Sequence, residues 1–156
     1  MSTRYEYFRD LDTTQYSAYG SSWVSQTFTP SIAHKITSVK LLLFRDDASS
    51  PGTVTVGIRA TDGSGHPTGP DLCSGTTDGN TLAENYPYEW REITLGVGYN
   101  LDADTMYAIV LRAPDATSDS RVRWRNAQFS SATYAGGMRE TSDDSGLSWT
   151  SDADRD

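Results

Sequence analysis

Two neighbouring stretches of aliphatic and β-branched residues, 36–44 and 53–60, limit the possible folds more than any other part of the chain. The second stretch alternates apolar with small or polar residues, a period of two that predicts a strand with one buried and one exposed face. The first is more apolar, and the loop between them contains the turn pair Pro51-Gly52. We expect two long antiparallel strands in the middle of a sheet. Their predicted inward residues are Val39, Leu41, Leu43, Val54, Val56, Ile58 and Ala60.

The rest of the chain consists of shorter strand-like segments separated by residues that favour turns. Gly and Pro are concentrated in 62–70, which predicts a loop, and 96–104 predicts a turn. No segment combines a sustained 3.6-residue period with helix caps. The sequence therefore predicts an all-β fold, a two-sheet antiparallel β-sandwich of jelly-roll or Greek-key type. Further strands are expected at 5–11, 23–29, 71–76, 80–83, 88–95, 105–113, 121–125 and around Tyr134.

Length and composition limit the class of protein. A chain of 156 residues without a repeat or linker is expected to be a single domain, 1–156, large enough for a real core. The net charge of −8 argues against nucleic acid as the main partner, because phosphate binding needs a basic surface. No apolar run approaches the roughly 20 residues that cross a bilayer, so membrane insertion is not expected. The single Cys73 excludes an internal disulfide.

The first ten residues contain no apolar segment of the kind found in a signal peptide. Two interpretations stay open. Either the protein is not exported by that route, or the segment has been removed from the sequence.

Residues that could support catalysis are not arranged in a recognisable motif. His34 and His66 have no Ser or Cys partner at motif spacing, and there is no Gly-x-Ser-x-Gly, His-Glu-x-x-His or Gly-rich phosphate loop. The many Asp residues lie in turns, where Asp is common for backbone reasons. We expect a protein that is not an enzyme.

A candidate metal site lies near the end of the sequence. Asp152, Asp154 and Asp156 have the alternating spacing that begins a calcium-binding loop, but the Gly and closing Glu of such a loop are missing. The alternative is a set of solvated turn carboxylates.

Aromatic residues suggest a candidate sugar-binding surface. Sugar rings stack their C–H faces on exposed aromatic rings, and their hydroxyls need polar neighbours. Tyr86, Tyr88 and Trp90 open a predicted strand and are the best candidates for ligand binding, with Trp23 and Trp149 as weaker ones. The alternative is that the tryptophans cover the sandwich core, and this alternative is strongest for Trp124.

Arg121, Arg123 and Arg125 share one face of the predicted strand 121–125. Three guanidinium groups so close together repel one another unless carboxylates face them. Two explanations stay open. The carboxylates come from neighbouring strands, or the row contacts an acidic surface of a partner as part of an interface.

Several short segments, in this order, resemble a known group of modules. They are Gln26–Thr29, Ile36–Val39, Pro51-Gly52, Gly69–Leu72, Glu89–Ile93, Met106–Val110 and Gly146–Trp149. Together they resemble surface jelly-roll modules of prokaryotes and their viruses, similar to carbohydrate-binding-module and choice-of-anchor domains. The resemblance covers nearly the whole chain but specifies fold better than ligand.

The resemblance implies a place on an extracellular or virion surface and, in many such modules, one structural calcium. It also implies a final strand rich in aromatic residues, where this sequence has ended at Arg155-Asp156. Either the sequence is trimmed, or that position in the sheet is empty, or another chain fills it.

Two functions remain. The first is a non-catalytic structural or assembly module that contacts other subunits through its edge strands and a polar face, by self-association or in a larger surface assembly. The second is a carbohydrate-binding module that binds a glycan with Tyr86, Tyr88 and Trp90.

Overall fold

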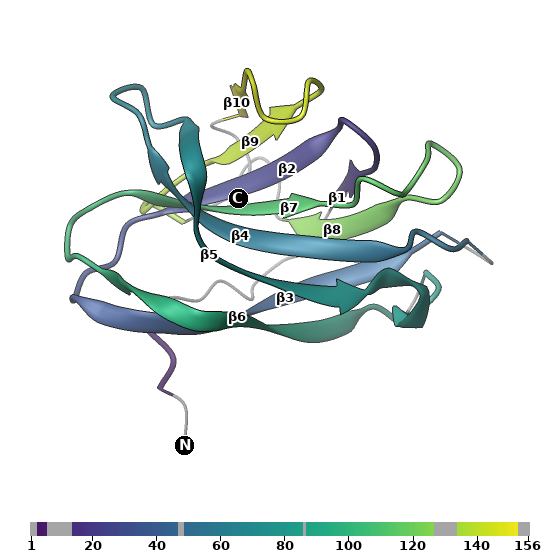
Figure 1. Ribbon diagram of the computed structural model, residues 1–156, viewed down its shortest axis with the longest axis horizontal. Helices are drawn as coiled ribbons and strands as arrows, with labels where there is room; N and C mark the ends of the chain where they lie inside the picture. The colour runs from purple at the N-terminus through teal and green to yellow at the C-terminus, as the bar shows by residue number, and fades with distance from the viewer. Residues whose placement is uncertain (1–2, 6–13, 47–48, 86, 127–133, 153–156) are drawn as a thin grey trace.

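The structure is a computed structural model that describes residues 3–5, 14–46, 49–85, 87–126 and 134–152. Within these ranges the chain forms ten strands and one short 3-10 helix, with no α-helix (Figure 1). No helix of the described residues is long and apolar enough to cross a membrane. The elements are β1 (Thr14–Ala18), β2 (Trp23–Phe28), β3 (His34–Arg45), β4 (Thr53–Thr61), β5 (Pro67–Asp78), η1 (Gly79–Thr81), β6 (Glu89–Leu101), β7 (Tyr107–Arg112), β8 (Val122–Asn126), β9 (Arg139–Ser142) and β10 (Thr150–Asp152).

The strands form two antiparallel sheets packed face to face, which confirms the predicted fold class (Figure 1). One sheet has four strands in the order β1-β8-β3-β6, and the other has six in the order β10-β9-β2-β7-β4-β5. β1 pairs with β8, β2 with β7, β3 with β6 and β4 with β5. Nested pairs of this kind, divided between two sheets, are a long hairpin rolled into a jelly roll. The β9–β10 hairpin widens the second sheet beyond β2.

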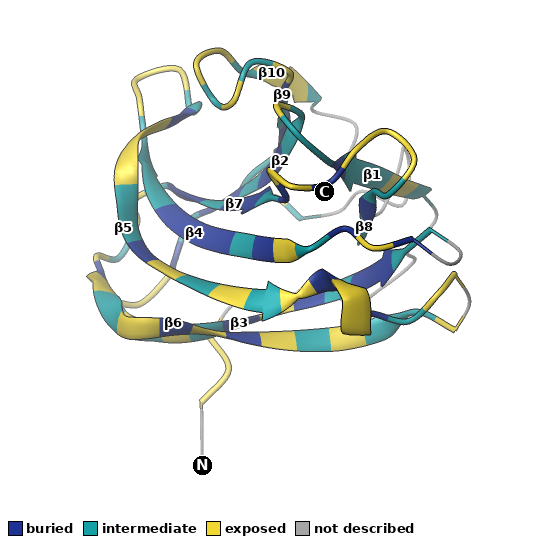
Figure 2. Ribbon diagram, turned by 45° about the vertical axis from the view of Figure 1, so that its right-hand side comes forward, coloured by how far each residue is buried: buried dark blue, intermediate teal, exposed yellow. Residues whose placement is uncertain are grey.

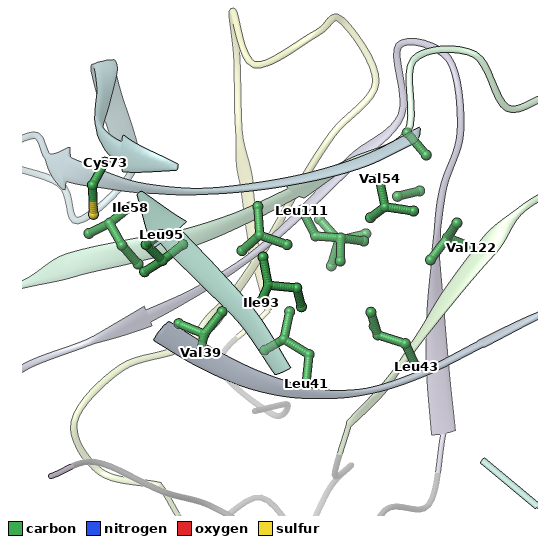
Figure 3. Packing of buried hydrophobic residues seen from close by; sticks show 14 of the residues in the cluster. Val39, Leu41, Leu43, Val54, Ile58, Cys73, Ile93, Leu95, Leu111 and Val122 are labelled. Carbon is green, nitrogen blue, oxygen red and sulfur yellow. The ribbon is translucent and has the colours of Figure 1, made fainter. Parts of the chain in front are cut away.

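The core lies between the sheets and is made by the alternating residues that the sequence singles out. Val39, Leu41 and Leu43 of β3 face Val54 and Ile58 of β4 across the interior (Figure 3). β7 is buried along most of its length and β4 at Val54 and from Val56 to Ile58, whereas β6 alternates between buried and exposed residues over its first half (Figure 2). Most of the predicted inward residues are therefore confirmed, with Ala60 only half-buried.

The predicted pairing of the two long strands is wrong. β3 belongs to the four-stranded sheet and β4 to the six-stranded sheet, so the two strands face each other and share no ladder. Alternation specifies which face of a strand is buried. It does not distinguish a neighbour in the same sheet from one in the opposite sheet.

The region 62–70, predicted to be a loop, is partly strand. β5 begins at Pro67, and a bulge places Gly69, Pro70, Asp71 and Leu72 opposite the single residue Arg59. β5 is an edge strand, where Pro is tolerated because one side of the backbone needs no ladder hydrogen bond. The turn itself is shorter than predicted, and it is closed by a hydrogen bond from Asp62 N to His66 O (2.9 Å).

The predicted turn at 96–104 is also largely strand. β6 continues to Leu101 across an irregularity opposite Thr37, with Gly96 and Gly98 at positive φ. A Cβ on Gly98 would lie 2.3 Å from the carbonyl oxygen of Ile36, so this close approach of β3 and β6 requires glycine.

The backbones of the two sheets meet where β5 passes β6. At Gly75 of β5, a Cβ would lie 1.9 Å from the carbonyl oxygen of Thr94 in β6. The backbones of the two edge strands are thus in direct contact there, although they belong to different sheets. On the other side, Arg139 of β9 contacts Tyr16 of β1, with 3.3 Å between the guanidinium carbon and the ring centroid.

Some expectations lie outside the described residues. Most of the predicted strand at 5–11 does, and so do Tyr86, Asp154, Asp156 and the end of the chain where a final strand was expected. Residues around Tyr134 precede β9, which begins at Arg139.

Candidate functional site

The outer face of the four-stranded sheet brings together two groups of residues that the sequence analysis treated separately. Trp90 of β6 lies directly across from Leu42 of β3, and Arg123 of β8 lies across from Phe44. These side chains point away from the core because their strand neighbours Leu41 and Leu43 point into it. The candidate ligand-binding and interface residues therefore share one surface, which we call the four-strand face.

On the four-strand face, Trp90 is the exposed aromatic ring, with 46% of its surface accessible. Tyr88 packs against Phe44 with 4.9 Å between ring centroids, and the Arg125 guanidinium lies 4.5 Å from the Tyr88 ring. Since Tyr88 is covered from two directions, only Trp90 of the described candidates offers an open platform.

The arginine row is compensated by a neighbouring carboxylate. Arg123 Nε lies 2.9 Å and Arg121 Nε 3.3 Å from the two oxygens of Asp46, which follows β3. Arg125 donates to the side-chain oxygen of Gln15 at 2.5 Å. The first of the two explanations, a carboxylate from a neighbouring strand, thus accounts for Arg121 and Arg123.

Of the three candidate calcium residues, only Asp152 lies within the described residues. Asp152 accepts a 2.8 Å hydrogen bond from Arg139 Nη2, so its carboxylate already has a cationic partner. Burial lowers the pKa of the Arg139 guanidinium, and Asp152 opposes that shift. Among the described residues, no cluster of three or more His, Cys, Asp or Glu side chains could hold a metal ion.

The outer face of the six-stranded sheet carries a charged cluster that the sequence analysis missed. The bulge in β5 carries Asp71 over Gly57, where its carboxylate accepts hydrogen bonds from Arg59 (2.8 Å) and Arg112 (3.1 Å). Both guanidinium groups lie 5.3 Å from the centroid of the Trp23 ring. Burial raises the pKa of Asp71, but the two arginines outweigh that effect and the net shift is downward.

The β4–β5 hairpin rises over this outer face towards β9 and β10 (Figure 1). His66, at the hairpin turn, contacts Glu140 of β9, with 2.8 Å between Nδ1 and Oε2. Glu140 is completely buried, and Ser151 Oγ of β10 donates to its other oxygen at 2.9 Å. This contact, the hairpin tie, fastens one edge of the sheet to the other.

A compact loop follows β9. The carboxylate of Asp144 accepts hydrogen bonds from Ser142 Oγ (2.8 Å), from Ser148 N (2.9 Å) and from Ser148 Oγ. These hydrogen bonds lower the pKa of Asp144 to about 2, and the bond from the Ser148 hydroxyl has the largest effect. The loop presents Leu147 to solvent with 89% of its surface accessible.

A cavity of about 390 Å³ opens beside the β1–β2 turn. It lies where the chain passes from β1 of one sheet to β2 of the other, and β9 forms part of the opposite wall. Its lining includes Tyr16, Tyr19 and Trp23 together with the polar side chains Gln15, Arg121 and Asp143. We call it the corner pocket.

The corner pocket includes Trp23 and Arg121, which the sequence analysis named for different roles. Local sequence spacing does not relate them, because Trp23 begins β2 whereas Arg121 precedes β8, which pairs with β1. No protein-family model matches this chain, and no curated protein matches it.

Proposed function

We propose that this domain is a non-catalytic structural module that makes contacts between subunits on an extracellular or virion surface. The observation that carries the proposal is the composition of the four-strand face. Exposed Trp90 adjoins Leu42, with Arg123 and Arg125 beside them. Protein interfaces are enriched in Trp, Tyr and Arg at their centres and surround them with polar groups.

The rim of the four-strand face is polar and already ordered. Lys40 lies 3.9 Å from Glu92, and Ser38 donates to Glu92 at 3.0 Å. The arginines are held in place by Asp46 and Gln15, so their side chains lose little conformational entropy when a partner binds. A second copy of this chain is the partner we propose.

Edge strands support the same function. Among the described strands, β1 and β6 stand at the ends of the four-stranded sheet, and β5 and β10 at the ends of the six-stranded sheet. Sheet edges are places where a neighbouring subunit can add a strand.

The test is the mass of the protein in solution, measured by light scattering after size-exclusion chromatography. We expect a mass at least double the 17.1 kDa of one chain. Trp90→Ala should reduce it towards the monomer, whereas Leu147→Ala, which removes an exposed apolar residue elsewhere, should not. A monomeric wild type, or equal assembly of Trp90→Ala and wild type, would refute the proposal.

Carbohydrate binding by Tyr86, Tyr88 and Trp90 is the second candidate, favoured by the exposure of the Trp90 ring. In that case the wild-type protein can be monomeric, and a glycan should change its tryptophan fluorescence. Trp90→Ala should abolish that change. The mass measurement and the fluorescence measurement therefore separate the two candidates.

A further inference from the structure

We propose that copies of this chain bind head to tail, with the four-strand face of one copy against the 113–120 loop of the next. The inference rests on the proposed function, since it names the surface of the second copy that the four-strand face contacts. Its basis is the separation of charge between the four-stranded sheet and one end of the sandwich.

The four-stranded sheet is basic although the whole chain has a net charge of −8. Among the described residues, the sheet and the side chains paired with it include seven basic groups, those of Lys35, Lys40, Arg45, Arg91, Arg121, Arg123 and Arg125. Four carboxylates oppose them, those of Asp46, Glu84, Glu89 and Glu92. The net charge of this set is +3, or +2 without Arg125. The other described residues have four basic and eleven acidic side chains, a net charge of −7.

The ion pairs on the four-strand face leave positive charge in excess. Asp46 contacts both Arg121 and Arg123, so one carboxylate opposes two guanidinium groups. Lys40 and Glu92 balance each other, with 3.9 Å between Nζ and Oε2. Two such faces packed against each other would bring like charges together, which costs free energy. An acidic surface of the second copy is therefore the better partner.

The 113–120 loop, between β7 and β8, is such a surface. It contains no Lys or Arg, and Pro114, Asp115 and Asp119 are exposed. Its backbone is ordered by hydrogen bonds from Ala116 N to Ala113 O (3.1 Å) and from Ser120 N to Thr117 O (3.1 Å). These bonds do not use the two carboxylates, which a partner's arginines can reach.

The neighbouring loop strengthens the negative charge at this end. The β1–β2 turn joins the two loops, because Gly20 N donates to Ala113 O (3.0 Å) and Ser145 N to Ser21 O (2.9 Å). Asp143 and Asp144 of the second loop already accept hydrogen bonds from serines. We therefore place the contact on Asp115 and Asp119, with the second loop adding to the field.

The opposite end of the sandwich suits the contact less well. Asp102 follows β6 there, but Lys35 lies at the start of β3. Arg4 is also at this end, because the ring of the next residue, Tyr5, stacks on His34 with 3.8 Å between centroids. These basic residues reduce the negative charge that the four-strand face would meet.

The order of groups in the loop matches the four-strand face. Trp90 and Arg123 are two strands apart and offset by two residues, which separates their Cα atoms by about 12 Å. The five residues from Pro114 to Asp119 can span up to about 17 Å. Pro114 can therefore pack on the Trp90 ring while the carboxylates reach the arginines. An apolar centre with charged groups around it is the usual composition of a protein interface.

The test is the mass of the full chain by light scattering at about 50 mM and about 500 mM NaCl. We expect the wild type to be at least double 17.1 kDa at low salt and to fall towards 17.1 kDa at high salt. Asp115→Lys/Asp119→Lys, the loop variant, should be monomeric at both. Asp102→Lys/Asp104→Asn is the comparable change at the opposite end, with Asn tolerating the positive φ of Asp104, and should assemble as the wild type does.

Mixing two variants tests the direction of the contact. The loop variant keeps its four-strand face, and Trp90→Ala keeps its 113–120 loop, so head-to-tail binding lets each supply what the other lacks. We expect each variant alone to be monomeric and an equal mixture at low salt to form a dimer and nothing larger. Formation of this dimer also shows that both variants are folded.

The inference alone is overturned if the loop variant assembles as the wild type does, which is the result for face-to-face pairing. It is also overturned if the opposite-end variant fails to assemble, if the mixture stays monomeric, or if salt leaves the mass unchanged. A wild type that is monomeric at low salt, or a Trp90→Ala protein that assembles by itself, overturns the proposed function as well.

Discussion

At the scale of single residues, the carboxyl group of Asp144 has a pKa of about 2, well below the ordinary Asp value of 3.8. Its low pKa means that the order it gives to the 142–148 loop is complete above the ordinary Asp pKa of 3.8 and is lost as the pH falls towards 2. We predict a midpoint of about 2 when the Asp144 carboxyl signal is titrated by ¹³C NMR. Ser148→Ala removes the first donor and should move the midpoint upward. Ser64→Ala, in a distant turn, should leave it unchanged, and an unmoved midpoint in Ser148→Ala would contradict the assignment.

Glu140 should matter for stability because it is buried completely and bonded to groups from two other segments. Glu140→Ala leaves His66 and Ser151 without their acceptor, and we predict a loss of about 1.5–3 kcal/mol in the free energy of unfolding. Urea denaturation monitored by tryptophan fluorescence measures it. Glu140→Gln keeps a polar group of the same size and should lose less. Hydrogen exchange in the 62–66 turn should accelerate in Glu140→Ala. If Glu140→Ala is as stable as Glu140→Gln, the hairpin tie does not contribute to stability.

Sequence reasoning identified the chemical character of single residues better than their partners. The arginine row was predicted to need a carboxylate, and Asp46 supplies it, but no sequence rule selects Asp46 from 21 acidic residues. Likewise, Asp71 was predicted to begin a strand, and only the bulge in β5 reveals that it binds two arginines. Partners that are distant in sequence depend on strand order, which local patterns do not contain.

At the scale of elements, the contact between β5 and β6 gives the sharpest prediction. Gly75→Ala places a methyl group against the Thr94 carbonyl and must push the two strands apart. We predict a loss of about 1–3 kcal/mol in the free energy of unfolding, measured by urea denaturation. Gly63→Ala is the matched control, since nothing lies within 4 Å of its Cβ position, and it should change stability by less than about 0.5 kcal/mol. Comparable losses for both variants would mean that glycine flexibility, and not the close contact, sets the effect.

Individual strands were predictable where alternation is regular, as in β4 and β8. In β5 and β6 strands were predicted but their extent was wrong, because Pro67, Pro70, Gly96 and Gly98 interrupt the pattern. Each of these residues is at a bulge or an edge, where a strand tolerates residues that would break a central one. Whether the extent of a strand could be predicted therefore depended on its position in the sheet, which is a property of the whole fold.

At the scale of the whole molecule, the jelly-roll pairing predicts slow folding. β1 must find β8 near the other end of the chain, and such distant pairings are formed late because the loop between them must first be closed. We predict refolding in milliseconds to seconds or longer, measured by stopped-flow tryptophan fluorescence. The rate should be the same with and without reductant, because Cys73 is a free thiol. Refolding within microseconds would contradict this pairing.

The fold class itself was predictable from the spacing of strands and turns, because two amphipathic sheets must bury their apolar faces against each other. The partner of each strand was not. β3 and β4 are adjacent in sequence and both strongly patterned, yet they stack across the core. A hairpin and a face-to-face arrangement bury the same alternate side chains, so the sequence pattern fits either one.

The unequal sides of the sandwich have a mechanical consequence. Along Gly75 and Thr94 the two sheets meet backbone to backbone, whereas on the β1 side the described contacts between them are the β1–β2 turn and side chains such as Arg139 against Tyr16. We therefore expect thermal fluctuations in the distance between the two sheets to be small along β5 and β6 and larger at β1. A molecule bound to both sheets at the β1 side would reduce these fluctuations and so make the whole domain more rigid.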